Sequence, residues 1–169
     1  MKKVIFLLIV FNFFTFNSKA QIAYIDINLI LNTSKVGKSL NLFIKKIEDD
    51  DLTRYKLIET ELIKKEKEII SQQNILKKEQ FQSKLTKLST EIQKYRSDKK
   101  MSSEKLNKIR FDKTKEILEV LNPIITKYVD SNAISIVLPK KNIIVGKKNL
   151  DITEQIITLL DNKNFKLNF

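Results

Sequence analysis

The sequence predicts a mainly helical protein in which a long antiparallel helical hairpin projects from a small strand-based body. Its 169 residues include only 2 Gly and 2 Pro, and residues 38–122 contain neither. Apolar residues recur through that stretch in alternating steps of three and four, which is typical of paired helices. Short segments rich in β-branched residues flank it on both sides, and they can share a sheet only if the stretch folds back.

The composition excludes most enzymatic chemistry. The chain has no Cys and no His, so it lacks a thiolate nucleophile, an imidazole base and the usual zinc ligands. With 2 glycines it also lacks a phosphate-cradling loop. We therefore expect no enzymatic activity, no cofactor and no metal site.

Residues 1–20 have the pattern of a secretory signal peptide. Lys2 and Lys3 precede an apolar run from Val4 to Phe16, and Ser18-Lys19-Ala20 places small residues at the cleavage site. A membrane anchor is the alternative, but the run is shorter than the roughly 20 residues that a spanning helix needs. We expect cleavage after Ala20, which removes three of the 32 Lys and Arg and none of the 20 acids, leaving +9 on an exported chain.

The first part of the body is predicted in residues 21–34. Ile22–Ile27 is short and rich in β-branched and aromatic residues, which indicates a strand. Asn28 can then cap a helical turn that runs through Leu31.

The arm is predicted in residues 35–122, with its tip near residues 74–79, where the apolar phase changes between Leu76 and Phe81. A single continuous coiled coil is the alternative, but it would hold the two ends on the order of 120 Å apart. The apolar seam of the first helix of the arm comprises Leu40, Ile44, Ile47, Tyr55, Ile58, Leu62, Ile69 and Leu76. The apolar seam of the second helix of the arm comprises Leu88, Ile92, Tyr95, Leu106, Ile109, Ile117, Val120 and Ile124.

The second part of the body is predicted in residues 123–169. Asn122-Pro123 either opens a fresh helix or kinks the arm where it enters the body. Two strands, Ile134–Leu138 and Asn142–Val145, are expected around a turn at residues 139–141. A last helix, carrying Ile152, Ile156, Ile157, Leu159 and Leu160, is expected to begin with a capping-box pattern of Asp151 and Glu154.

The body is small, so its open strand edges predict self-association. The residues expected to build that oligomeric body are Ile22, Tyr24, Ile25, Ile134, Ile136, Leu138 and Ile144.

Charge is distributed unevenly along the arm. Residues 48–71 have 5 basic and 8 acidic side chains, and residues 83–106 have 7 and 3, so the two arms are expected to complement each other. The arm roots carry uncompensated positive charge, and the tip is a secondary candidate. The predicted anion- or client-binding residues are Lys35, Lys38, Lys45, Lys46, Lys108, Arg110, Lys113 and Lys115 at the roots and Lys77 and Lys78 at the tip.

Taken in order, several segments resemble the Skp (OmpH) family of periplasmic chaperones, over nearly the whole chain after residue 20. They are Ile22-Ala-Tyr-Ile-Asp-Ile27, Ser34-Lys-Val-Gly37-Lys38, Asn74-Ile-Leu-Lys-Lys-Glu-Gln-Phe81, Asn122-Pro123 and Asn149-Leu-Asp-Ile-Thr-Glu154. One departure is Lys77, which stands where relatives often have a Ser that caps the second arm.

The resemblance implies a periplasmic homotrimer whose strands form a central body and whose hairpins surround a cavity. Unfolded outer-membrane proteins would be held there without nucleotide, metal or other cofactor. The root lysines would line the upper cavity wall and attract acidic clients, anionic lipid or lipopolysaccharide.

Two other functions fit a basic coiled coil. Nucleic-acid binding would follow from charge alone, but the signal peptide argues against it, and no nucleic-acid partner is expected. An envelope adaptor would dock a single folded partner, whereas a holdase would keep several unrelated unfolded proteins soluble.

Overall fold

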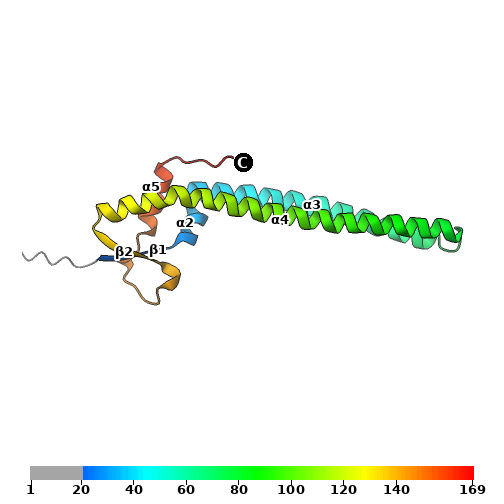
Figure 1. Cartoon of the computed structure of the whole chain (residues 1–169), viewed down its shortest axis with the longest axis horizontal. Helices are drawn as coiled ribbons and strands as arrows, with labels where there is room; N and C mark the ends of the chain where they lie inside the picture. The colour runs from blue at the N-terminus through cyan, green and yellow to red at the C-terminus, as the bar shows by residue number, and fades with distance from the viewer. Residues whose placement is uncertain (1–20) are drawn as a thin grey trace, which may run out of the picture.

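The structure is a computed structural model that describes residues 21–169; the predicted signal peptide, residues 1–20, lies outside them. One long helical hairpin extends from a small body that contains both ends of the described chain (Figure 1). The elements are β1 (Gln21–Ile25), α2 (Ile27–Thr33), α3 (Lys35–Ser71), α4 (Lys78–Ser131), β2 (Ile134–Pro139) and α5 (Thr153–Asn162), with 3-10 turns at Lys140–Asn142 and Lys148–Leu150. The predicted fold class is confirmed.

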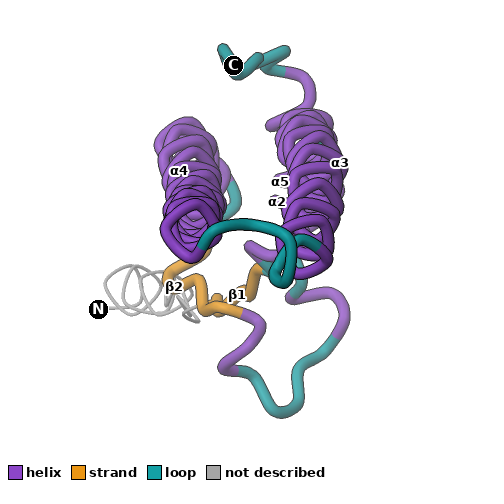
Figure 2. The backbone as a smooth tube through the Cα atoms, turned by 90° about the vertical axis from the view of Figure 1, so that its right-hand side faces the viewer, coloured by secondary structure: helices purple, strands orange, loops and turns teal. Residues whose placement is uncertain are grey.

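The arm consists of α3 and α4, which lie side by side along most of their lengths (Figures 1 and 2). Their 37 and 54 residues correspond to about 55 and 80 Å at 1.5 Å per residue. They are joined by a turn at residues 72–77, two residues earlier than the predicted tip. The turn begins early because the Gln72 carbonyl accepts hydrogen bonds from the Ile75 and Leu76 amides.

The two predicted seams hold the arms together. All sixteen seam residues are buried or half-buried, and Leu40, Ile44, Leu106 and Ile117 belong to the main core. Polar residues Lys99, Ser102 and Lys113 continue the three-and-four spacing of α4 where apolar residues are missing. The pairing is therefore tightest at the arm root.

Pro123 does not open a new helix. α4 runs through it to Ser131 and ends at a turn in which Ala133 adopts φ 51°. A proline inside a helix removes one backbone hydrogen bond, and here the apolar residues that follow, such as Ile124, pack against the core and keep the helix continuous.

Within residues 21–169 the sheet of the body has two strands rather than the predicted three. β1 and β2 are parallel, with Ile22 opposite Ile136 and Tyr24 opposite Leu138, so the whole hairpin forms the crossover between them. The predicted strand Asn142–Val145 is wrong: a 3-10 turn covers Lys140–Asn142, and Ile144 is fully exposed. A segment rich in β-branched residues does not form a strand unless a neighbouring strand is available to pair with it.

Two predicted helix caps are also corrected. The carboxylate of Asp26, not Asn28, caps α2 by accepting a hydrogen bond from the Leu29 amide at 2.9 Å. Asp151 and Glu154 form no capping box, because Asp151 makes a bridge with Tyr24 and its carboxylate accepts from the Thr153 amide at 3.1 Å. α5 therefore begins two residues after Asp151.

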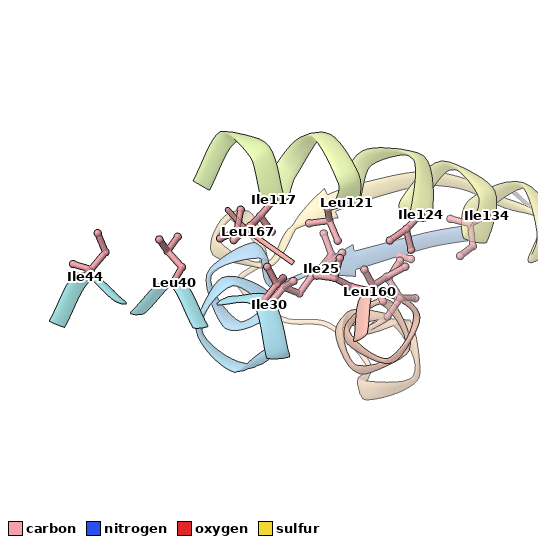
Figure 3. Packing of buried hydrophobic residues seen from close by; sticks show 14 of the residues in the cluster. Ile25, Ile30, Leu40, Ile44, Ile117, Leu121, Ile124, Ile134, Leu160 and Leu167 are labelled. Carbon is pink, nitrogen blue, oxygen red and sulfur yellow. The ribbon is translucent and has the colours of Figure 1, made fainter. Parts of the chain in front are cut away.

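The core lies where the arm roots meet β1, α2 and α5 (Figure 3). Ile30, Ile117, Leu121, Ile156 and Leu160 are the largest apolar side chains that are fully buried. Three separate helices, α2, α4 and α5, contribute them, so the body fixes the direction in which the arm leaves it.

Candidate interaction surfaces of the arm and the body

The lysines at the root of α3 form one basic face. Lys35, Lys38, Lys45 and Lys46 are all exposed, and no ion pair involves them among the described residues. Their spacing places them around Leu42, which is 69% exposed, and opposite the seam residues Leu40 and Ile44. We call these four lysines the α3 root face.

The α4 residues of the predicted root cluster do not extend this face. Arg110 pairs with Glu48 across the hairpin at 2.8 Å, and the side chain of Lys113 lies in the seam beside Glu116 at 2.7 Å. Lys108 and Lys115 lie on the side of α4 opposite α3, paired with Asp112 at 3.0 Å and Glu119 at 3.7 Å. The structure therefore does not join the two root segments into one positive cluster.

Only two of the ten ion pairs in the described residues link α3 to α4: Arg110–Glu48 and Lys65–Glu91, at 2.8 and 2.7 Å. The hydrogen bond to Glu91 raises the pKa of Lys65. Most of the remaining pairs join residues three or four apart on one helix. The charges of α3 and α4 therefore complement each other in their net sign, and few of them form ion pairs between the two helices.

The tip carries two lysines and an apolar residue. Lys77 stands at the N-terminus of α4 and makes no side-chain capping bond, as expected for a residue without a capping oxygen. Lys77 and Lys78 are exposed, and the neighbouring Ile75 is 80% exposed. The tip therefore offers both charge and apolar surface to solvent.

A polar and aromatic node, formed by the seam residues Tyr55 and Tyr95 and their neighbours, lies halfway along the arm. Tyr55 is 7% exposed, donates its hydroxyl hydrogen to the Asp98 carbonyl at 2.9 Å and meets Tyr95 edge to face. On the neighbouring turn the Ser102 hydroxyl donates to the Asp51 carboxylate. The centre of the hairpin is therefore held by hydrogen bonds as well as by aromatic packing.

The predicted body residues divide into two groups. Ile25 and Ile134 are buried in the chain's own core, and Tyr24 is covered by the segment around Gly146. Ile22, Ile136 and Leu138 are 37–50% exposed on the outer face of the sheet, and Ile144 and Val145 are 100% and 90% exposed nearby in the chain. We call these five residues the outer body patch.

The described residues contain no group of three or more acidic side chains arranged to hold a metal ion. None of the helices in residues 21–169 combines the length and the apolar character needed to cross a membrane.

Comparisons with known proteins identify the family. Residues 21–160 match the family described as "Outer membrane protein (OmpH-like)". The chain belongs to the OmpH-like family. The resemblance inferred from the sequence is thereby confirmed, and no curated protein matches the chain.

The OmpH-like fold is also seen in a solved structure. A protein from Caulobacter crescentus CB15, described as a putative outer membrane chaperone (OmpH-like), superimposes with a TM-score of 0.79 over 89% of each chain. The two sequences are 14% identical, so the likeness concerns the fold. The α3 root face, the tip, the node and the outer body patch all lie within the OmpH-like residues 21–160.

Sequence reasoning missed two apolar features. Large apolar residues off the seams are exposed along the arms, namely Leu42, Leu52, Leu57, Ile63, Ile70, Met101 and Phe111. Residues 163–169 fold back on the arm root and bury Leu167, although they lie beyond the OmpH-like match. The signal for the first feature is that these apolar residues fall outside the seam pattern. The signal for the second is the alternation of apolar and polar residues over residues 165–169.

Proposed function

We propose that this protein is an ATP-independent holdase chaperone of the periplasm, which binds unfolded outer-membrane proteins and keeps them from aggregating on the way to the outer membrane. The proposal assigns it no catalytic step and no cofactor. Membership of the OmpH-like family supports a chaperone role, and the arm described above supports the manner of binding.

The observation that carries the proposal is a pair of long helices that, beyond their roots in the core, contact each other and no other part of the described chain. Seven large apolar side chains on them are 46–70% exposed and are separated by charged residues. An unfolded β-barrel protein exposes alternating apolar residues and unpaired backbone. Scattered weak contacts shield such a chain, and they release it once its apolar residues are buried elsewhere.

The outer body patch supports a homotrimer. Among the described residues β2 has one unpaired edge, whereas Asp151 bridges to the outer edge of β1, and the outer body patch exposes five apolar residues. An exposed apolar patch next to an open strand edge is a self-association surface. Three hairpins projecting from one shared body would then enclose a cavity, with their exposed apolar residues available to a client.

The α3 root face gives this cavity a positive upper wall. Its four lysines form no ion pair with any residue of the described chain, whereas the neighbouring α4 cations are paired. Unpaired charge of one sign attracts an oppositely charged chain over about a Debye length, roughly 10 Å at 0.1 M salt. We expect this face to raise the rate at which acidic clients are captured.

This role is tested with matched charge changes. Lys45→Gln with Lys46→Gln should slow capture severalfold at low salt and little at high salt, measured by stopped-flow fluorescence. Lys108→Gln with Lys115→Gln removes the same charge from ion-paired positions and should have a smaller effect. Equal effects of the two variants would show that only net charge matters.

The α3 root face also favours binding of anionic lipid, including lipopolysaccharide, because Leu42 lies among its lysines. Vesicles with and without anionic lipid provide the test. Binding that is equal for both, or that survives Lys45→Gln with Lys46→Gln, would rule this partner out.

One experiment tests the proposed function as a whole. The chain from residue 21 is sedimented with and without an outer-membrane protein diluted from urea. A trimer mass and a soluble complex with several unrelated clients are expected. A stable complex with one folded partner and none with unfolded clients would favour an adaptor, and a trimer that leaves every client insoluble would exclude the holdase.

A further inference from the structure

Residues 163–169, which we call the tail, lie along the root of the arm. α5 ends at Asn162, and Asn164, with a φ of 49°, then reverses the chain, so that residues 165–169 run back along the arm root (Figure 1). Asparagine tolerates this left-handed conformation better than most residues. Asn164 therefore turns residues 165–169 toward α3.

Three alternating side chains attach the tail. Phe165 is half-buried, Leu167 is 8% exposed near Ile117 (Figure 3), and Phe169 stacks on Phe43 with ring centroids 4.1 Å apart. The intervening Lys166 and Asn168 are exposed. The tail thus binds as an extended segment with its apolar side chains on one side and its polar ones on the other.

The attachment consists of side-chain packing alone. Within the described chain, residues 165–169 take part in no hydrogen bond or ion pair with other residues. A pocket of about 330 Å³ also remains beneath the tail, bordered by Lys35, Val36 and Ser39 of α3 and by Leu160 of α5. A segment held in this way can be displaced without breaking a polar contact.

From this arrangement we propose that the groove under the tail is a binding site for extended segments of unfolded β-barrel clients, and that the tail occupies it until a client arrives. Strands of such barrels alternate apolar and polar residues as the tail does. The inference rests on the proposed function for the identity of the occupant, whereas the groove and its present occupant are features of this chain.

Peptide binding tests the groove directly. The probe is a labelled peptide with the sequence of residues 163–169, followed by fluorescence anisotropy on the full chain. A variant with Phe165→Ser, Leu167→Ser and Phe169→Ser should bind it at least about tenfold more tightly than the unaltered protein. Lys166→Ser with Asn168→Ser changes the exposed positions and should leave binding unchanged. Equally weak binding by all three proteins would overturn the proposal.

A second pair of changes keeps the tail in place, so it tests the proposal even if the serine variant is destabilised. The chain has no cysteine, so Ser39→Cys and Lys166→Cys can be joined by a short bismaleimide across the pocket. The cross-linked protein should lose peptide binding and capture clients severalfold more slowly than the same variant without cross-linker. Unchanged client capture would show that clients do not use the groove.

The two proposals fail differently. If no form of the protein keeps a client soluble while the serine variant still binds the peptide, the holdase function is wrong and the groove stands. If clients stay soluble but neither the serine changes nor the cross-link alters binding, the tail is only a structural strap.

Discussion

Replacing Gly37 by alanine should destabilise the protein, although alanine is the better helix former. Gly37 lies in the first turn of α3, where Ser34 ends α2 and caps α3 by accepting a hydrogen bond from the Gly37 amide at 3.2 Å. A Cβ at Gly37 would lie 2.0 Å from the carbonyl oxygen of Leu31 and 2.6 Å from its carbon. The corner between α2 and α3 leaves no space for it.

The size of the effect follows from two opposing contributions. Alanine in a helix is favoured over glycine by about 1 kcal/mol. Against this, α2 and α3 must move apart by about 1 Å before the new Cβ lies 3.0 Å from the Leu31 carbonyl oxygen. The clashing atoms belong to the backbone, so no side-chain rotation can relieve the contact. Overpacking costs about 1–3 kcal/mol and more where backbone must move. The expected net loss is about 2 kcal/mol, or roughly 4–8 °C in melting temperature for a chain of this size.

Thermal and urea unfolding followed by circular dichroism at equal protein concentration measures the effect. Ser39→Ala is the matched control, since Ser39 is exposed two residues further along the same helix and should gain about 0.5 kcal/mol. If Gly37→Ala were as stabilising as Ser39→Ala, the tight corner would be refuted, and with it the argument that the body fixes the direction of the arm.

Three further changes test other parts of the structure. Ala133→Gly should stabilise the chain by about 0.5–1 kcal/mol, because φ is 51° at this position; an unchanged melting temperature would contradict the strain. Tyr55→Phe should cost about 1 kcal/mol in urea unfolding by removing the hydrogen bond to Asp98, and no loss would show that the node is solvated. Burial alone would raise the pKa of Asp151, but hydrogen bonds from Thr153 and the nearby Lys140 lower it, so its carboxylate adds stability above about pH 4 that is lost as pH falls. Thr153→Val should therefore move the acid-unfolding midpoint to higher pH, and an unmoved midpoint would exclude this contribution.

The hairpin could be predicted because its signal is long and repeated. Apolar residues recur over more than eighty positions without glycine or proline, so an error at one position does not change the result. The approach of α4 to the body was harder to read, because Pro123 favours a helix start while the apolar residues after it favour continuation. Packing against the core decided between the two.

The remaining errors concern features that depend on distant residues. Ile143, Ile144 and Val145 have strand-forming side chains, but whether they join a sheet depends on a free neighbouring strand. Glu48, Glu116 and Glu119 lie just outside the two root segments in the sequence, and they pair with Arg110, Lys113 and Lys115. A count along the sequence cannot show which side of a helix each charge occupies.

The parallel pairing of β1 with β2 sets the order in which a newly made chain can be completed. Ile25 is synthesised more than a hundred residues before its partner strand, a delay of roughly 5–20 s at ordinary elongation rates. The two long helices need only each other, and local contacts of that kind form in far less time. In the proposed trimer, each copy would therefore complete its hairpin before β1 and β2 pair, which would disfavour premature association of incomplete chains.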